Sequence, residues 1–124
     1  MVNDPAKSLG NVIREARVAK GLGLRELARR AEMTPSYLSD IENDRRVPAE
    51  EVLRTIGRHL DLDFDDLMAR AGRLGDEAMR YMSRTPAVGV LMRKLSAANA
   101  PADLVEKLAK DVDRKIGKTP KGGG

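Results

Sequence analysis

Two short amphipathic helical patterns separated by a tight turn occupy residues 21–48, GLGLRELARRAEMTPSYLSDIENDRRVP. Leu27 and Ala31 share one face of the first pattern. Leu38 and Ile41 share one face of the second pattern. Both pairs can therefore enter one core. This spacing predicts two packed helices, the second of which has an outer face left to contact another surface.

The second of these helices has a recognisable beginning and end. Thr34 is expected to cap it with a side-chain oxygen, and Pro35 stands in the first turn, where a missing N–H has no cost. The helix is predicted to end near Glu42 and Asn43. We expect Glu42 to close the helix by hydrogen-bonding locally or to an arginine.

The rest of the chain also has helical periodicity. Aromatic residues make up only 2% of the 124 residues. An interior of Leu, Ala, Val, Ile and Met suits helix-on-helix packing better than a sheet. We therefore predict an all-α fold. The expected helices cover about residues 8–20, 24–31, 34–43, 48–60, 64–71, 76–83, 87–98 and 101–116.

Gly72 and Gly75 mark a boundary between two parts. Residues 1–72 are predicted to form a five-helix domain, and residues 73–116 a small helical module. Residues 117–124, GKTPKGGG, are predicted to be a disordered basic tail, because they contain nothing to bury.

The net charge of +4 and the pI near 9.6 favour an acidic partner, but the basic residues are unevenly distributed. Residues 1–72 hold 12 Lys/Arg and 13 Asp/Glu, whereas residues 73–124 hold 11 and 6. In the first part, placement therefore matters more than total charge. Arg45 and Arg46 stand directly after the second helix of the pair, where they can meet phosphates.

Several classes of protein are disfavoured by composition. The chain has no cysteine, which excludes disulfides and thiol catalysis and fits a cytoplasmic protein. No apolar leader is visible, and no apolar run is long enough to cross a bilayer, so we expect no membrane partner. With one histidine and no phosphate-binding loop, we expect neither an enzyme nor a cofactor.

A cluster of aspartates follows the fourth expected helix. These residues, Asp61, Asp63, Asp65 and Asp66, superficially suggest a calcium loop. The glycine and the distant glutamate that such a loop requires are missing. Helix capping and solvation are the better interpretation, and no metal site is predicted.

The segment from Leu9 to Leu67 resembles the DNA-binding domain of the Xre-type helix-turn-helix regulators, the class of the phage repressors and Cro. The matching motifs are Leu27-Ala28, Thr34-Pro35-Ser36-Tyr37-Leu38-Ser39, Ile41-Glu42-Asn43, Arg45-Arg46, Pro48, Leu60 and Asp66-Leu67. The resemblance implies a repressor-like helix-turn-helix domain that inserts its third helix into the DNA major groove.

The resemblance also assigns site residues. The implied base-reading residues are Pro35, Ser36, Ser39 and Asp40. The implied phosphate-binding residues are Thr34, Tyr37, Asn43, Arg45 and Arg46, with Arg14, Arg17 and Arg25 extending the footprint. Plainer roles stay open. Tyr37 can be a half-buried ring, Asp40 can pair with a loop arginine, and the helix arginines can be solvated.

The chain departs from the family pattern in three places. Glu32 and Asp44 stand where glycine is common, so we expect both to adopt left-handed backbone. Gly23 and Leu24 replace a polar cap and a glutamine that usually approach a phosphate. That contact must be lost or taken over by backbone N–H groups and Arg25.

Family members bind as dimers to two half-sites, since one such domain makes few contacts. We therefore predict a homodimer on a palindromic or pseudo-palindromic operator. The expected dimerisation residues are Val88, Leu91, Leu95, Leu104, Leu108 and Val112. Folding of these helices back onto their own domain is the alternative.

The predicted function is that of a transcription regulator, most consistent with a repressor of its own or a neighbouring promoter. An antitoxin whose residues 73–124 bind a protein toxin is a second hypothesis. A third is an adaptor whose residues 34–43 bind protein instead of DNA, which a steep salt dependence of duplex binding would exclude.

Overall fold

The computed structural model describes residues 6–117, and within that range it is entirely helical, as predicted. The helices are α1 Leu9–Ala19, α2 Leu24–Arg30, α3 Pro35–Glu42, α4 Glu50–Leu60, α5 Phe64–Arg70, α6 Asp76–Arg84, α7 Pro86–Ala97 and α8 Ala102–Ile116. Residues 6–75 and 76–117 form two compact units, called here the N-terminal unit and the C-terminal unit. Apart from Gly117, the predicted tail lies outside the described residues.

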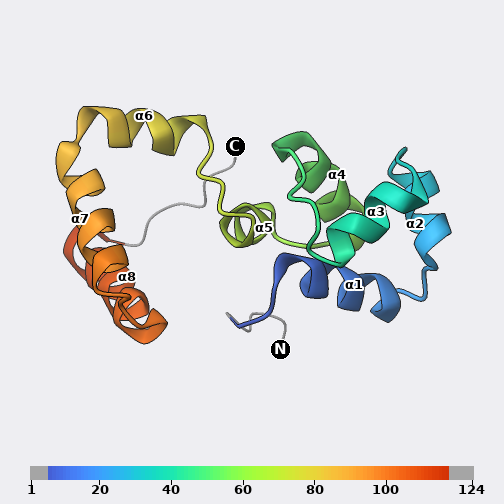
Figure 1. The fold of residues 1–124 in the computed structure, drawn as a ribbon, viewed down its shortest axis with the longest axis horizontal. Helices are drawn as coiled ribbons and strands as arrows, with labels where there is room; N and C mark the ends of the chain where they lie inside the picture. The colour runs from blue at the N-terminus through green and yellow to red at the C-terminus, as the bar shows by residue number, and fades with distance from the viewer. Residues whose placement is uncertain (1–5, 118–124) are drawn as a thin grey trace. The chain divides into compact units, whose positions relative to one another are not determined.

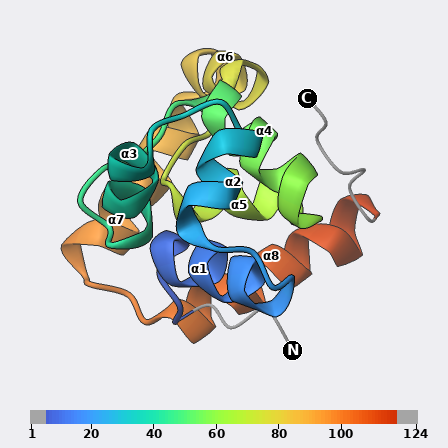
Figure 2. The same ribbon diagram turned by 90° about the vertical axis from the view of Figure 1, so that its right-hand side faces the viewer.

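The N-terminal unit consists of α1 to α5 around one hydrophobic core (Figures 1 and 2). Helix α3 packs on both α1 and α2, and α4 packs on both α1 and α5. The core side chains come from all five helices and are almost completely buried. They are Leu9, Val12, Ile13, Leu27, Ala28, Leu38, Ile41, Leu53, Ile56, Leu60, Leu67 and Met68.

Side-chain caps fix the beginnings of three helices. Ser8 Oγ accepts from the backbone N–H of Asn11 at 3.1 Å and begins α1. Thr34 Oγ1 accepts from the N–H of Tyr37 at 3.0 Å and begins α3, as predicted. Asp63 caps α5 in the same way. These local bonds explain why the helix starts follow closely from sequence.

The predicted start of α4 at Pro48 is wrong by two residues. The helix begins at Glu50, with Ala49 as its cap residue. Pro48 is instead fully buried, and its carbonyl oxygen accepts from Arg73 Nε at 2.8 Å. Packing and this long-range bond hold Pro48 in the connection, outside the helix.

Left-handed backbone ends several helices. Glu32 and Asp44 both have φ 59°, which confirms the two predicted turns. Asp61 and Asn99 adopt φ 56° and 47°, although neither was predicted to adopt left-handed backbone. Asp and Asn tolerate this conformation better than most residues, so the cost at three of the four turns is small.

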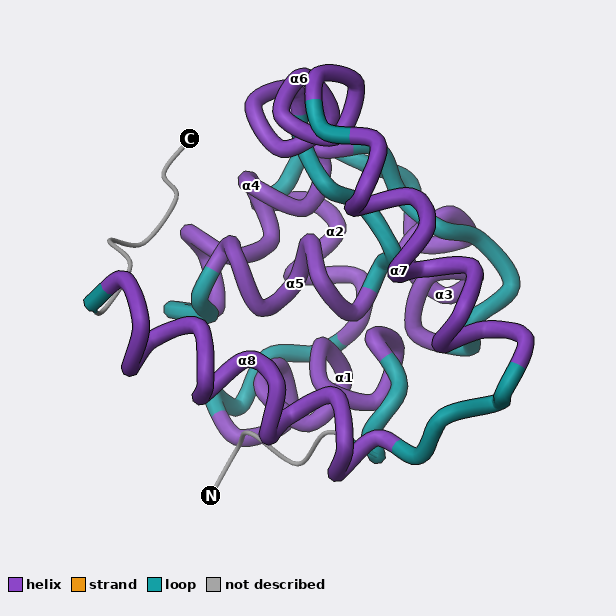
Figure 3. The backbone as a smooth tube through the Cα atoms, turned by 90° about the vertical axis from the view of Figure 1, so that its left-hand side faces the viewer, coloured by secondary structure: helices purple, strands orange, loops and turns teal. Residues whose placement is uncertain are grey.

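The C-terminal unit has no comparable core. Within residues 76–117 no side chain is fully buried, although α6 packs on α7. Figure 3 shows α7 and α8 leading away from their connecting turn in different directions. Both helices have exposed apolar side chains, among them Val90 on α7 and Val112 on α8.

Candidate nucleic-acid interface

Helix α3 divides into a buried face and an outward face. Leu38 and Ile41 are completely buried and anchor it in the core. Ser36 is exposed, and Ser39 and Asp40 are partly exposed. The outward face is thus small and polar, as the helical spacing predicted. Side chains of this size allow a helix to approach base edges closely.

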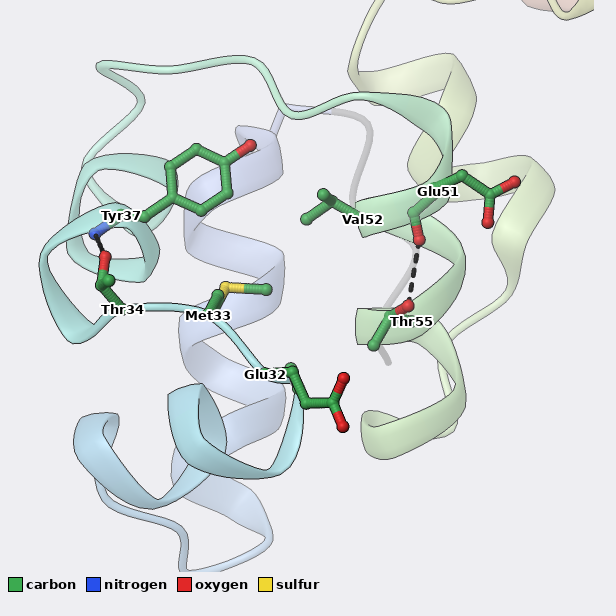
Figure 4. Close-up of a pocket in the computed structure, with 8 residues that line it drawn as sticks. Glu32, Met33, Thr34, Tyr37, Glu51, Val52 and Thr55 are labelled. Atoms are coloured by element: carbon green, nitrogen blue, oxygen red, sulfur yellow. Dashed lines mark hydrogen bonds between the residues drawn. The ribbon is translucent and has the colours of Figure 1, made fainter.

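The first turn of α3 lies beside a shallow hollow shared with α4. Figure 4 shows the ring of Tyr37 and the side chains of Met33 and Val52 around this hollow. Tyr37 is partly buried, and the guanidinium of Arg46 lies 5.3 Å from the centre of its ring. The structure therefore gives Tyr37 a packing role and places an arginine next to its ring.

The loop after α3 carries two exposed arginines, Arg45 and Arg46. Arg45 Nε lies 3.8 Å from Asp40 Oδ1, a long and exposed ion pair that contributes little to stability. The loop is held against α1, because Asp44 Oδ1 accepts from the backbone N–H of Gly10 at 2.9 Å. The two guanidinium groups therefore stand on an anchored backbone.

A buried ion pair joins α1 to the end of α3. Glu42 is only 2% exposed, and its Oε2 accepts from Arg17 Nε at 2.7 Å while Oε1 accepts from Arg17 Nη2 at 3.0 Å. The hydrogen bond to Glu42 raises the pKa of the Arg17 guanidinium above its ordinary value, so the guanidinium stays charged. The prediction that Glu42 bonds to an arginine is confirmed.

This pair changes the role of one predicted phosphate contact. The side chain of Arg17 is 13% exposed, and its Nη1 also donates to the carbonyl of Leu22 at 2.8 Å. Its donors are thus directed inward, and we omit Arg17 from the phosphate-binding set. The sequence alone could not decide this, because Glu42 lies 25 positions away.

Arg14 has a mixed environment. Its side chain is 40% exposed, yet Nη2 donates to the Glu42 carbonyl at 3.2 Å and to Asn43 Oδ1 at 2.8 Å. The amide of Asn43 is likewise engaged within the protein, since its nitrogen donates to the carbonyl of Ser39. Arg14 and Asn43 therefore make hydrogen bonds that hold the end of α3 within the protein. Arg25, on α2, is exposed.

Gly10 is a residue that the sequence analysis did not single out for this site. It is buried where α1 crosses the end of α3, and a Cβ there would lie 2.4 Å from the carbonyl oxygen of Glu42. Real Cβ atoms do not approach backbone this closely. A glycine inside an otherwise regular helix was the available signal, because it marks close backbone approach.

One of the aspartates after α4 caps a helix as predicted, and another forms an ion pair that was not predicted. Asp61 Oδ2 accepts from Lys20 Nζ at 2.6 Å, which lowers the pKa of the Asp61 carboxyl. Asp63 caps α5. Among residues 6–117 there is no group of three or more His, Cys, Asp or Glu side chains that could hold a metal ion.

The comparison with known families agrees with this geometry. A family model described as a helix-turn-helix domain matches residues 8–71, slightly more than half of the chain. The chain belongs to the Xre-type helix-turn-helix transcriptional regulators. Members of this family bind DNA, and helices α1 to α5 lie within the matched residues.

Relatives of this helix-turn-helix protein include named regulators. The transcriptional regulator ClgR of Mycobacterium tuberculosis is 35% identical over 79 residues, which cover 64% of this chain and 70% of that protein. The ImmF control region 10 kDa protein of Bacillus phage phi105 is 39% identical over 61 residues, 49% of this chain and 68% of that protein. A crystal structure of the biofilm regulator SinR in complex with DNA is 34% identical, covers 48% of this chain and 97% of that chain, and has a TM-score of 0.46.

The helix-turn-helix domain occupies the N-terminal unit, and the predicted dimerisation residues lie in the C-terminal unit. Val88 and Leu95 are partly buried there. The other four are exposed: Leu91 47%, Leu104 42%, Leu108 37% and Val112 48%. Within residues 6–117, no helix is both long and apolar enough to cross a bilayer.

Proposed function

We propose that this regulator reads the major groove with α3 and grips the flanking phosphates with Arg45 and Arg46. The observation that carries the proposal is the polar outward face of α3. Ser36, Ser39 and Asp40 lie on this face, while the opposite face of the same helix is anchored in the core. Small polar side chains can hydrogen-bond base edges, and the adjacent arginines supply charge. Pro35 offers only an apolar contact, such as one to a thymine methyl group.

The phosphate contacts can be tested on the full chain by replacing Arg45 and Arg46 together with alanine. We expect weaker binding to every duplex and a smaller slope of affinity against salt concentration, because two phosphate contacts are lost. The matched control replaces Arg29 and Arg30 with alanine. These arginines pair with Glu26 on α2, and their replacement removes the same amount of positive charge. Equal losses in both variants would contradict the assignment.

We further propose that the protein is a homodimer and binds two half-sites of a palindromic or pseudo-palindromic operator. Support comes from the C-terminal unit, whose apolar residues on α7 and α8 are exposed in the single chain. Burial of apolar surface contributes about 25 cal/mol per Å², so such faces favour association. Joining two reading helices one turn of DNA apart would raise affinity and fix the spacing.

Dimerisation can be measured by analytical ultracentrifugation of the full chain. Leu104→Glu with Leu108→Glu should give a monomer with much weaker operator binding, whereas Glu106→Gln on the same helix should leave the dimer intact. A wild-type chain that stays monomeric well above micromolar concentration would contradict the dimer. That result would favour the antitoxin hypothesis, in which the same apolar faces bind a different protein.

The regulatory outcome proposed is repression, by occupation of the protein's own or a neighbouring promoter. Selection of bound duplexes from a random pool would give the half-site and spacing together. A reporter placed behind the selected sequence should then lose expression when the protein is present. Increased expression would contradict repression while leaving DNA binding intact.

A further inference from the structure

Three side chains form a hydrogen-bonded relay from α1 to the outward face of α3. Arg14 Nη2 donates to Asn43 Oδ1 at 2.8 Å. Asn43 Nδ2 then donates to the carbonyl oxygen of Ser39 at 2.8 Å and to Ser39 Oγ at 3.3 Å. The relay therefore ends on a hydroxyl group of the proposed base-reading face.

The two short contacts of this relay fix the orientation of the Asn43 amide. A guanidinium group can only donate, so the oxygen of the amide must face Arg14. A backbone carbonyl can only accept, so the NH₂ group must face Ser39. Turning the amide over would break both bonds. The nitrogen beside the Ser39 hydroxyl is consequently a donor, and the hydroxyl accepts from it.

A serine hydroxyl has a single proton, and here that proton cannot point at Asn43. Within residues 6–117, the structure gives the Ser39 hydroxyl no acceptor, neither in the preceding turn of α3 nor in the loop. Ser39 is partly exposed. Its proton is thus left for a partner outside the protein.

We propose that Asn43 orients Ser39 as a hydrogen-bond donor, so that Ser39 selects a base with an acceptor in the major groove. Such acceptors are guanine O6 and N7, adenine N7 and thymine O4, whereas the amino group of cytosine is disfavoured. Asn43 is then a positioning residue that sets specificity without touching the base. The inference rests on the proposed function, in which α3 enters the major groove.

The experiment is selection from a random duplex pool with the full-length wild type, S39A, N43A and N43D. The base pair whose preference disappears in S39A is the one that Ser39 contacts. At that pair the wild type should favour an acceptor by about tenfold, and S39A should lose the preference. S36A is the control, since Ser36 lies outside the relay and should change a different pair.

The asparagine variants test the positioning role. In N43A the hydroxyl loses its orienting donor, so the preference at the Ser39 pair should relax while preferences elsewhere remain. In N43D the carboxylate can only accept, so the Ser39 hydroxyl donates to it and presents lone pairs to DNA. Preference at that pair should then change toward cytosine, which presents only its N4 amino donor in the major groove and offers the wild-type hydroxyl no acceptor there. Thermal unfolding monitored by circular dichroism checks that each variant is folded.

Three results would overturn the proposal. One is a wild-type preference for a cytosine amino group at the Ser39 pair. Another is an unchanged preference at that pair in folded N43A, and the third is a uniform loss across all base pairs in both asparagine variants. Failure of the proposed function looks different, because the wild type would then bind duplexes with no base preference that S36A or S39A alters.

Discussion

The two units of this chain are both helical, yet they differ in how much of their apolar surface is buried. The N-terminal unit buries side chains from all five of its helices in one core. In the C-terminal unit no residue between 76 and 117 is buried, and α8 exposes an apolar side chain at Leu104, Leu108 and Val112. Helical periodicity thus predicts an apolar stripe equally well in both units, but it does not say what covers the stripe.

This difference in burial suits the two units to different roles. The core of the N-terminal unit holds α3 in place, which the proposed base-reading role requires, because hydrogen-bond recognition depends on accurate placement. Exposed apolar faces in the C-terminal unit suit association with another chain instead. Three matched pairs of substitutions and one single substitution test this difference between the units, and they follow in order of decreasing effect.

Leu53→Ala should lower the free energy of unfolding by about 4 kcal/mol, because Leu53 on α4 is completely buried and its removal leaves a cavity. Leu91→Ala, on exposed α7, should change it by less than about 0.5 kcal/mol in dilute protein. Urea unfolding followed by circular dichroism measures both. Equal effects in dilute protein would mean that the C-terminal unit has a hidden core.

Glu42→Ala should cost about 3 kcal/mol, since it leaves the guanidinium of Arg17 buried without its partner. Glu106→Ala on exposed α8 removes the same charge and should have little effect. Urea unfolding again gives the difference. A small loss for Glu42→Ala would show that Arg17 can turn out to solvent, and it would restore Arg17 as a candidate phosphate contact.

Gly10→Ala and Gly89→Ala should have opposite signs. At Gly10 the new methyl group would meet the backbone carbonyls of Ile41 and Glu42, at a cost of about 2 kcal/mol. At Gly89 on α7 nothing lies within 4 Å of the new Cβ, so higher helix propensity should stabilise the protein by up to about 1 kcal/mol. Thermal unfolding of the two variants would settle the signs.

Glu26→Gln should produce the smallest effect, visible mainly as a change in pH dependence. Hydrogen bonds from Arg30 and Arg29 lower the pKa of the Glu26 carboxyl below its ordinary value of 4.5. The Glu26 carboxyl therefore binds a proton less readily in the folded protein than in the unfolded chain. Its contribution to folding stability is complete at neutral pH and is lost as pH falls below about 5.

The stability difference between wild type and Glu26→Gln should thus shrink between pH 7 and pH 3. It should also shrink in concentrated salt, because the pairs of Glu26 are exposed and screened. Urea midpoints at both pH values are the measurement. A difference that grew in acid would contradict the lowered pKa.

Much of the N-terminal unit was predictable because its signals are local. Thr34 caps α3 through a bond that spans three residues, and Glu32 and Asp44 occupy the positive-φ turns expected of them. The start of α4 was not predictable in the same way. Pro48 is held by packing and by Arg73, which lies 25 positions later in the chain.

Local sequence patterns were enough to predict the helices, apart from the start of α4, together with the apolar face of each helix and the side chains on the outward face of α3. These properties depend on neighbours within a few positions, through caps, turns and the 3.6-residue period. Tertiary contacts were needed to show that Arg17 turns inward to Glu42 and that Asn43 bonds to both Arg14 and Ser39. Those assignments depend on side chains of α1 that contact the end of α3. The local sequence pattern does not show which arginine of a helix will make such a contact.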